Sequence, residues 1–207
     1  MERLNPNLEQ KINEGWSQEF HFVEDAENEL EIASLIAGFA NSNDGVLVVG
    51  VKENGKVVGS FPKQVTEDFE HILSQFLSDQ IKFTMEEVLF GRHLLTRFFI
   101  KKSLLKISVI NNSSKETYLR IGFNTVPVNK IVLKAWALEH HSLTVEMDDL
   151  HREMLSYFHQ NKSISLSNVY KVSKMKKSII DKLISELLYL KQIHLVINNN
   201  RIEYLLR

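Results

Sequence analysis

Basic side chains gather near the C-terminus of this 207-residue chain, and their positions suit contact with phosphate groups. Residues 151–207 carry 10 basic and 4 acidic side chains, whereas residues 1–50 carry 2 basic and 10 acidic ones. A basic surface attracts the phosphate backbone of nucleic acids, and each contact adds to a salt-dependent affinity. The candidate nucleic-acid-binding residues of this region are Lys171, Lys174, Lys176, Lys177, Lys182 and Arg201.

Three helices and a hairpin are the elements that would position these basic residues. Apolar residues recur at helical spacing in three segments, and an asparagine turn separates two strand-like runs. The five segments are residues 150–158, 164–172, 176–190, 192–197 and 201–206. This is the element order of a small winged helix-turn-helix domain, which we place at residues 147–207. In such domains the third helix enters the major groove and the hairpin contacts the backbone.

Double-stranded DNA is therefore the predicted partner, with RNA as the alternative nucleic acid. Many proteins of this kind bind symmetric half-sites as homodimers, so a homodimer is the default expectation. Winged helices also serve as protein-interaction or dimerisation units. A non-catalytic interaction module is thus a further alternative that the residues leave open.

The N-terminal region has the pattern of a mixed α/β domain. The helices are expected at residues 26–41, 66–77 and 131–140, with Thr66 as a cap of the second. A β-branched run, an asparagine-glycine turn and several later apolar runs indicate strands that pair mostly antiparallel. The expected strands are residues 46–51, 56–58, 83–90, 94–100, 104–110 and 116–121. The fold class is α+β, with a first domain at residues 1–142 and a linker near residues 141–146.

Several segments of this region follow a recognisable order. They are Ala37 to Gly45 (AGFANSNDG), Gly50-Val51, Asn54 to Gly59 (NGKVVG) and Tyr118 to Thr125 (YLRIGFNT). The region from about residue 14 to 127 resembles the Schlafen AlbA-type domain. The resemblance implies a bacterial DNA-binding transcriptional regulator in which the AlbA-like domain precedes a winged helix. The chain differs from the family pattern at His21, where the family has lysine, at Asp44, and at Lys52-Glu53.

The same resemblance implies a second, enzymatic function. Some animal Schlafen proteins are metal-dependent RNA nucleases, and their three acidic residues match Glu14, Glu19 and Glu53 by position. Three carboxylates that meet in space could hold Mg²⁺ or Mn²⁺ and activate water. The resemblance also places Arg120 at a strand edge, where an arginine could bind phosphate or a carboxylate. A regulator without catalytic activity is the favoured interpretation, and no cofactor is expected unless the nuclease alternative holds.

Composition and motifs argue against several other classes of function. The chain has no cysteine, which excludes disulfides, thiolate zinc sites and cysteine nucleophiles. The segment Gly50 to Lys56 matches the start of a phosphate-binding loop, but Val57 stands where that loop needs serine or threonine, so an ATPase is not expected. The sequence has neither a membrane-length apolar run nor a signal peptide, and a cytoplasmic location is expected.

Overall fold

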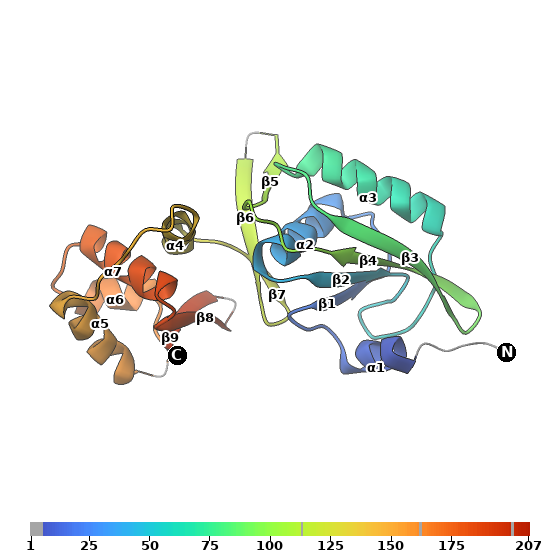
Figure 1. Cartoon of the computed structure of the whole chain (residues 1–207). Helices are drawn as coiled ribbons and strands as arrows, with labels where there is room; N and C mark the ends of the chain where they lie inside the picture. Colours follow the sequence, from blue (N-terminus) through green and yellow to red (C-terminus); the bar gives the residue numbers. More distant parts are fainter. Residues whose placement is uncertain (1–5, 113, 162, 200) are drawn as a thin grey trace. The chain divides into compact units, whose positions relative to one another are not determined.

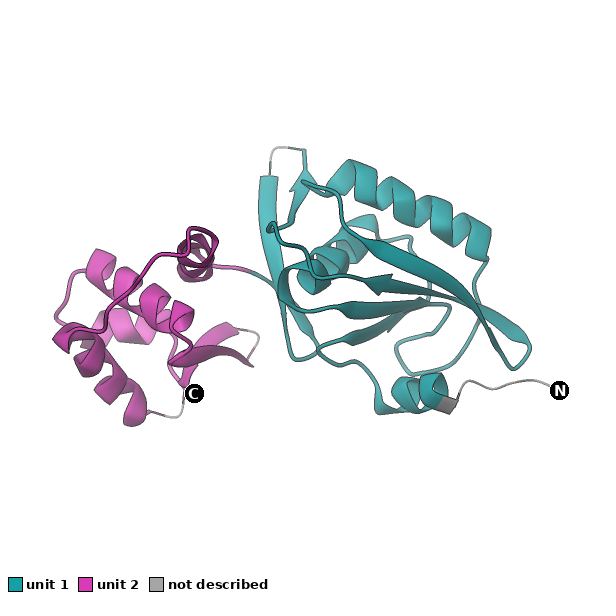
Figure 2. Ribbon diagram, viewed as in Figure 1, with its two compact units in different colours: residues 1–127 teal, residues 128–207 magenta. Residues whose placement is uncertain are grey.

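A computed structural model of the chain describes residues 6–112, 114–161, 163–199 and 201–207. The chain divides into two compact units, residues 1–127 and residues 128–207 (Figure 2). Each unit has a hydrophobic core of its own, and each is described separately below.

The first unit is built around a four-stranded sheet with the order β1-β2-β4-β3 (Figure 1). β1 and β2 run parallel, with Phe20 opposite Val46, and α2 connects them. The other neighbours in this sheet pair antiparallel. The elements of the unit are α1 (Pro6–Glu14), β1 (Phe20–Val23), α2 (Glu29–Ser42), β2 (Gly45–Val49), α3 (Pro62–Phe76), β3 (Phe83–Phe90), β4 (His93–Ile100), β5 (Ser108–Asn111), β6 (Ser114–Ile121) and β7 (Asn124–Pro127).

The alternation of side chains along the strands explains the layers of this unit. On β2, Leu47 and Val49 pack into the larger core with α2 and α3. The intervening Val48 points to the opposite face and packs with Leu8 and Ile12 of α1. Helices therefore cover the sheet on both faces, which is why β2 is a continuous apolar run rather than an alternating one.

A second, three-stranded sheet with the order β5-β6-β7 packs against α2. Asn41, which is buried near the end of α2, holds the two together. Its side-chain amide donates to the carbonyl oxygens of Ile107 and Tyr118, both at 2.7 Å, and its carbonyl oxygen accepts from the backbone N–H of Ile107. This bracing role accounts for an asparagine in the AGFAN segment.

The second unit contains four helices followed by a two-stranded hairpin among its described residues. The elements are α4 (Lys130–His140), α5 (Asp149–His159), α6 (Leu166–Val172), α7 (Lys177–Tyr189), β8 (Ile193–Asn198) and β9 (Arg201–Leu206). Ile164 forms a single bridge with Tyr204 of β9 and so extends the hairpin by one short strand. The three predicted helices and the hairpin of this region are therefore present.

The boundary between the units lies earlier than the sequence analysis placed it. The helix predicted at residues 131–140 was assigned to the first domain, but α4 belongs to the second unit. Ile131 of α4 is fully buried and packs in the core of that unit with Ile180 and Ile184 of α7. Asn129 caps α4 and donates from its side-chain amide to the hydroxyl of Tyr204 at 2.9 Å.

Smaller differences concern element ends. The helix predicted at residues 66–77 begins at Pro62, because proline suits the first turn of a helix; the hydroxyl of Thr66 donates to the carbonyl oxygen of Pro62 instead of capping. Residues 56–58 form only a bridge between Val51 and Val57. Residues 104–107 precede β5 as a loop, and α1, β1 and β7 were not predicted.

None of the helices in the described residues is long and apolar enough to cross a membrane.

We expect Ile131→Ala to lower the free energy of unfolding of the second unit by at least about 2 kcal/mol, the cost of removing a buried isoleucine. Leu133→Ala, two positions along α4 where the side chain is 46% exposed, is the matched control and should cost far less. Urea unfolding followed through Trp136 of α4, in a Trp16→Phe background, measures both. Equal effects of the two variants would contradict the assignment of α4 to this core.

Candidate functional site

The predicted basic residues surround the turn between α6 and α7. Lys171 lies in the last turn of α6, and Lys174 lies in the turn itself. Lys176 and Lys177 are the N-cap and the first residue of α7, and the first turn of this helix contains no acidic residue. All four side chains are exposed. The partial positive charge of the helix N-terminus adds to theirs, so this end of α7 is a favourable position for an anion.

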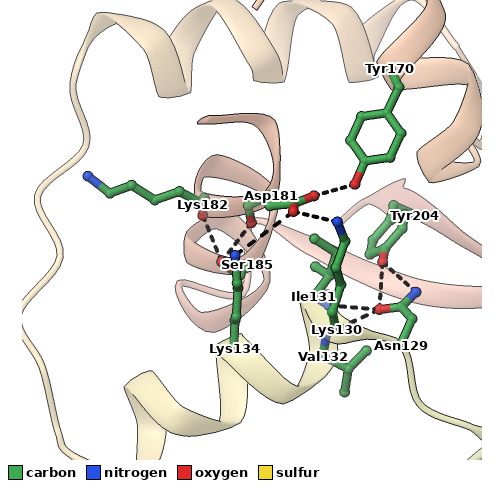
Figure 3. Close-up of polar contacts among 10 residues, drawn as sticks. All are labelled: Asn129, Lys130, Ile131, Val132, Lys134, Tyr170, Asp181, Lys182, Ser185 and Tyr204. Atoms are coloured by element: carbon green, nitrogen blue, oxygen red, sulfur yellow. Dashed lines mark hydrogen bonds and ion pairs between the residues drawn. The ribbon is translucent and has the colours of Figure 1, made fainter. Parts of the chain in front are cut away.

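The remainder of α7 is less accessible, because α4 packs along it (Figure 3). The carboxylate of Asp181 pairs with Lys130 at 2.6 Å and Lys134 at 3.9 Å, both from α4, and accepts a hydrogen bond from Tyr170. Burial opposes ionisation of Asp181, but the hydrogen bonds from Lys130 and Tyr170 outweigh it and hold its pKa below the ordinary value. Asp181 is therefore a carboxylate that fixes α4 to α7.

Two later residues of α7, Ser185 and Tyr189, also use their hydroxyl groups within the unit. Ser185 is buried and donates to the carbonyl oxygens of Asp181 and Lys182. The hydroxyl of Tyr189 donates to the carbonyl oxygen of Leu143, in the segment after α4, at 2.9 Å. Beyond the first turn, Lys182 stays exposed, and its ammonium lies 3.8 Å from Glu186. Thus the accessible part of α7 is its N-terminal turn together with Lys182.

Arg201, the last basic candidate of this unit, is exposed at the start of β9, where it pairs with Asn198 across the hairpin. Lys130 and Lys134 are two further basic residues of this unit, and they were not among the predicted ones. Their i, i+4 spacing after the capping Asn129 places both on one face of a helix, and this signal was present in the sequence. It was missed because the helix was assigned to the other domain.

Arg120 does not lie at an accessible strand edge, which corrects its prediction as a phosphate-binding residue. Its side chain is only 2% exposed. The guanidinium donates to the carbonyl oxygens of Ser17 and Gln18 and to the hydroxyl of Thr125, and it lies 4.5 Å from the centre of the Phe39 ring. Burial lowers its pKa to about 10, so it remains a cation at neutral pH. Its partners are internal, and no donor is directed toward a phosphate in solvent.

The three glutamates of the nuclease alternative do not form a metal site. Glu14 ends α1 and accepts from the side chain of Gln10, Glu19 precedes β1, and Glu53 lies in the turn after β2. All three side chains are exposed on separate segments. Within the described residues, no group of three or more histidine, aspartate or glutamate side chains could hold a metal ion. The residues therefore do not fit the metal that the nuclease alternative requires.

The segment that matches the start of a phosphate-binding loop is a tight turn. Gly55 donates to the carbonyl oxygen of Lys52, and Lys52 donates to that of Lys56. The next helix begins only at Pro62, whereas a phosphate-binding loop leads directly into a helix. Lys52 instead forms an exposed ion pair with Glu24 at 2.9 Å.

His21, which replaces the family lysine, has an unusual environment. It is 6% exposed on β1, and its ring stacks on that of Trp16 with 4.2 Å between the ring centres. The side-chain N–H of Trp16 donates to the carbonyl oxygen of Phe22 and fixes the indole. Burial, with a smaller effect of the Arg120 cation, lowers the pKa of His21 to about 3. The imidazole is neutral at physiological pH.

Comparison with known proteins identifies the first unit. Residues 10–129 match the Schlafen, AlbA_2 family, and this match covers more than half of the chain. The chain therefore belongs to the Schlafen, AlbA_2 family. The matched region ends within two residues of the boundary between the two units.

Two solved structures show partial similarity to the chain. The crystal structure of the DIP2311 protein from Corynebacterium diphtheriae is 18% identical with a TM-score of 0.43, and the similarity covers 63% of this chain and 25% of that protein. The N-terminal domain of a protein described as ATP-dependent DNA helicase RecG-related, from Nitrosomonas europaea, is 16% identical with a TM-score of 0.45, and 57% of this chain and 88% of that domain are covered. The chain thus spans about a quarter of the length of the Corynebacterium protein. No curated protein matches the sequence.

Arg120→Leu should destabilise the first unit by at least about 2 kcal/mol, because it removes three hydrogen bonds of a buried guanidinium and leaves the partly buried carbonyl oxygens of Ser17 and Gln18 without this donor. Urea unfolding followed by circular dichroism measures the effect. Arg92→Leu, at an exposed site in the turn between β3 and β4, should change stability by no more than about 0.5 kcal/mol. A loss no larger for Arg120 than for Arg92 would show that the buried guanidinium contributes little.

His21 should make the first unit sensitive to acid. Because the folded pKa of about 3 lies below the ordinary value of 6.5, the unfolded chain binds a proton between these values and the folded chain does not. Stability is therefore lost as pH falls below 6.5, by about 2 kcal/mol from this residue between pH 7 and pH 5. His21→Phe should remove that part of the pH dependence, and His194→Phe, at an exposed site on β8, should not. Identical pH dependence of the free energy of unfolding in wild type and His21→Phe would contradict the lowered pKa of His21.

Proposed function

We propose that the protein is a transcriptional regulator that binds double-stranded DNA through its second unit, and that α5 to β9 form a winged helix-turn-helix domain. One observation carries the proposal. Four exposed lysines surround the N-terminal end of α7, immediately after a helix and a short turn. In a helix-turn-helix, this is the end of the recognition helix that contacts base edges, while neighbouring residues contact phosphates.

The charge of the two units supports the same assignment. Residues 128–207 carry 12 basic and 8 acidic side chains, whereas residues 1–127 carry 13 basic and 18 acidic ones. Phosphate backbones are therefore attracted to the second unit and repelled by the average charge of the first. The resemblance to AlbA-type domains that precede a winged helix in bacterial regulators points to the same function.

The packing of α4 limits how α7 can meet DNA. Because Asp181 pairs with Lys130 and Lys134 of α4, the later turns of α7 cannot lie along the floor of a groove. We infer that the helix enters the major groove with its end, so that Lys176 and Lys177 reach the backbone and Ser178 approaches the bases. Arg201 at the hairpin tip would add a phosphate contact from the wing. A homodimer would double this small contact on symmetric half-sites.

Reversal of two charges tests the proposal. We expect Lys176→Glu/Lys177→Glu to weaken binding to duplex DNA at least tenfold and to reduce the slope of log affinity against log salt by about 1 for each lysine. The matched control is Lys63→Glu/Lys115→Glu, which changes the net charge equally at exposed sites of the first unit. Fluorescence anisotropy of labelled duplex DNA across a salt series measures both the affinity and its dependence on salt.

The outcomes separate the alternatives. Equal losses in the two double variants would contradict contact through the end of α7. Tighter binding of structured RNA than of duplex DNA, with the same dependence on Lys176 and Lys177, would make RNA the partner. Absence of binding to either nucleic acid at low salt would favour a protein-interaction module.

A further inference from the structure

A cavity of about 340 Å³ opens on the first unit where the start of β1, α2 and the β6–β7 turn come together. Its volume lies at the lower end of the range of small-molecule sites in proteins. Trp16 and His21 form one side, and Glu31 and Ser34 of α2 form another. Phe123 of the β6–β7 turn and Asn124 at the start of β7 form the third. Neither the DNA-binding proposal nor the nuclease alternative uses this cavity.

His21 lines this cavity with a largely buried imidazole ring that carries an unsatisfied nitrogen. The residue is 94% buried, and its ring nitrogen Nδ1, which lies just below the surface with less than 1 Å² accessible, has no hydrogen-bond partner among the described residues. A buried polar group without a partner costs free energy, and a ligand that supplies the missing hydrogen bond recovers it. Because the imidazole is neutral, it can act as donor or acceptor toward a neutral ligand, but it offers no charge to a phosphate.

The other walls combine aromatic surface with hydrogen-bond acceptors. Phe123 is 56% exposed at the rim, on a turn where Gly122 has a φ of +60°. Such an exposed ring offers a planar group a surface for stacking. The carboxylate of Glu31 accepts one hydrogen bond from Asn28 at 2.9 Å and, as a carboxylate, can accept more from N–H groups of a ligand.

Internal hydrogen bonds hold these walls in place before any ligand binds. Arg120 ties the segment that carries Trp16 to Thr125, since its guanidinium donates to Ser17, Gln18 and Thr125. The side chain of Gln18 donates to the carbonyl oxygen of Arg120 and accepts from the N–H of Gly122, beside Phe123. Preorganisation of this kind lowers the entropy that a ligand loses on binding.

We propose that this cavity binds a nucleobase, stacked on Phe123 and hydrogen-bonded to His21 and Glu31. A planar ring with N–H groups and ring nitrogens matches an aromatic rim, a neutral imidazole and a carboxylate. A phosphate or carboxylate ligand is disfavoured beside Glu31. The proposal does not depend on DNA binding by the second unit, because both the residues and the ligand chemistry differ.

Intrinsic fluorescence gives a direct test, because Trp16 lies in the cavity and the other tryptophan of the chain, Trp136, lies in the second unit. The full-length Trp136→Phe protein is titrated with adenosine, guanosine, cytidine and uridine to millimolar concentrations. At least one nucleoside should change Trp16 emission saturably. His21→Phe, which keeps an aromatic ring beside Trp16 but removes both nitrogens, should weaken that binding at least tenfold, which corresponds to about 1.4 kcal/mol.

Further variants separate recognition from folding. Phe123→Ala should also weaken binding, whereas Phe61→Ala, at an aromatic side chain that is 80% exposed outside the cavity, should leave it unchanged. Equilibrium dialysis of the wild-type protein with the same nucleoside provides a measurement that does not depend on tryptophan, and circular dichroism confirms that each variant is folded. Saturable binding that His21→Phe and Phe123→Ala both retain would overturn the proposal.

Three ligands that contain the same base show whether the natural ligand is a free metabolite or part of a nucleic acid. They are the nucleoside, its 5′-monophosphate and a short single-stranded oligonucleotide. Binding of the nucleoside or monophosphate identifies a free metabolite as the ligand. Binding of the oligonucleotide alone, with the same dependence on His21, identifies a base presented by a single strand. Absence of saturable binding for all three would overturn the proposal while leaving the DNA-binding test of Lys176 and Lys177 unaffected.

Discussion

The buried guanidinium of Arg120 is the interaction on which the first unit depends. Three hydrogen bonds and a contact with the Phe39 ring connect β6 to the segment before β1, to β7 and to α2. A cation in such a place is tolerated only when its donors are satisfied, and here carbonyl and hydroxyl oxygens satisfy them. Gly38 makes the arrangement possible, because a Cβ there would lie 3.1 Å from Thr125 and 3.2 Å from Arg120.

The motifs that identify the family thus have a structural explanation in this chain. In YLRIGFNT, Arg120 and Thr125 form part of the internal network, and Gly122 supplies a backbone conformation that other residues rarely adopt. In AGFAN, Gly38 allows the close approach of the arginine, and Asn41 braces the second sheet. These residues hold the fold, and the surfaces available for recognition lie around them rather than on them.

Local pattern predicted most elements of the structure, but not how they assemble. The helical periodicity of residues 26–41 and 176–190 located α2 and α7 within a few residues. β1 was missed because FHFV is only four residues long and its parallel pairing with β2 involves residues distant in sequence. The apolar face of α4 predicted a helix without indicating which core it joins. Arg120 was wrongly predicted to lie at an accessible strand edge for a similar reason. Residue type and strand position do not reveal which face of a sheet another element covers.

The opposite charges of the two units constrain what each can contribute to recognition. In the second unit, Asp181 neutralises part of the charge of Lys130 and Lys134. The positive charge of Lys176 and Lys177 at the N-terminal end of α7 is not offset in this way. In the first unit, acidic side chains outnumber basic ones, and the guanidinium of Arg120 is buried and makes three internal hydrogen bonds. On the functions proposed above, contact with phosphates falls to the second unit, and the ligand of the first unit is recognised by stacking on Phe123 and by hydrogen bonds to His21 and Glu31. The two proposals together would let one chain attach to a polyanion through one set of residues and recognise a small planar group through another.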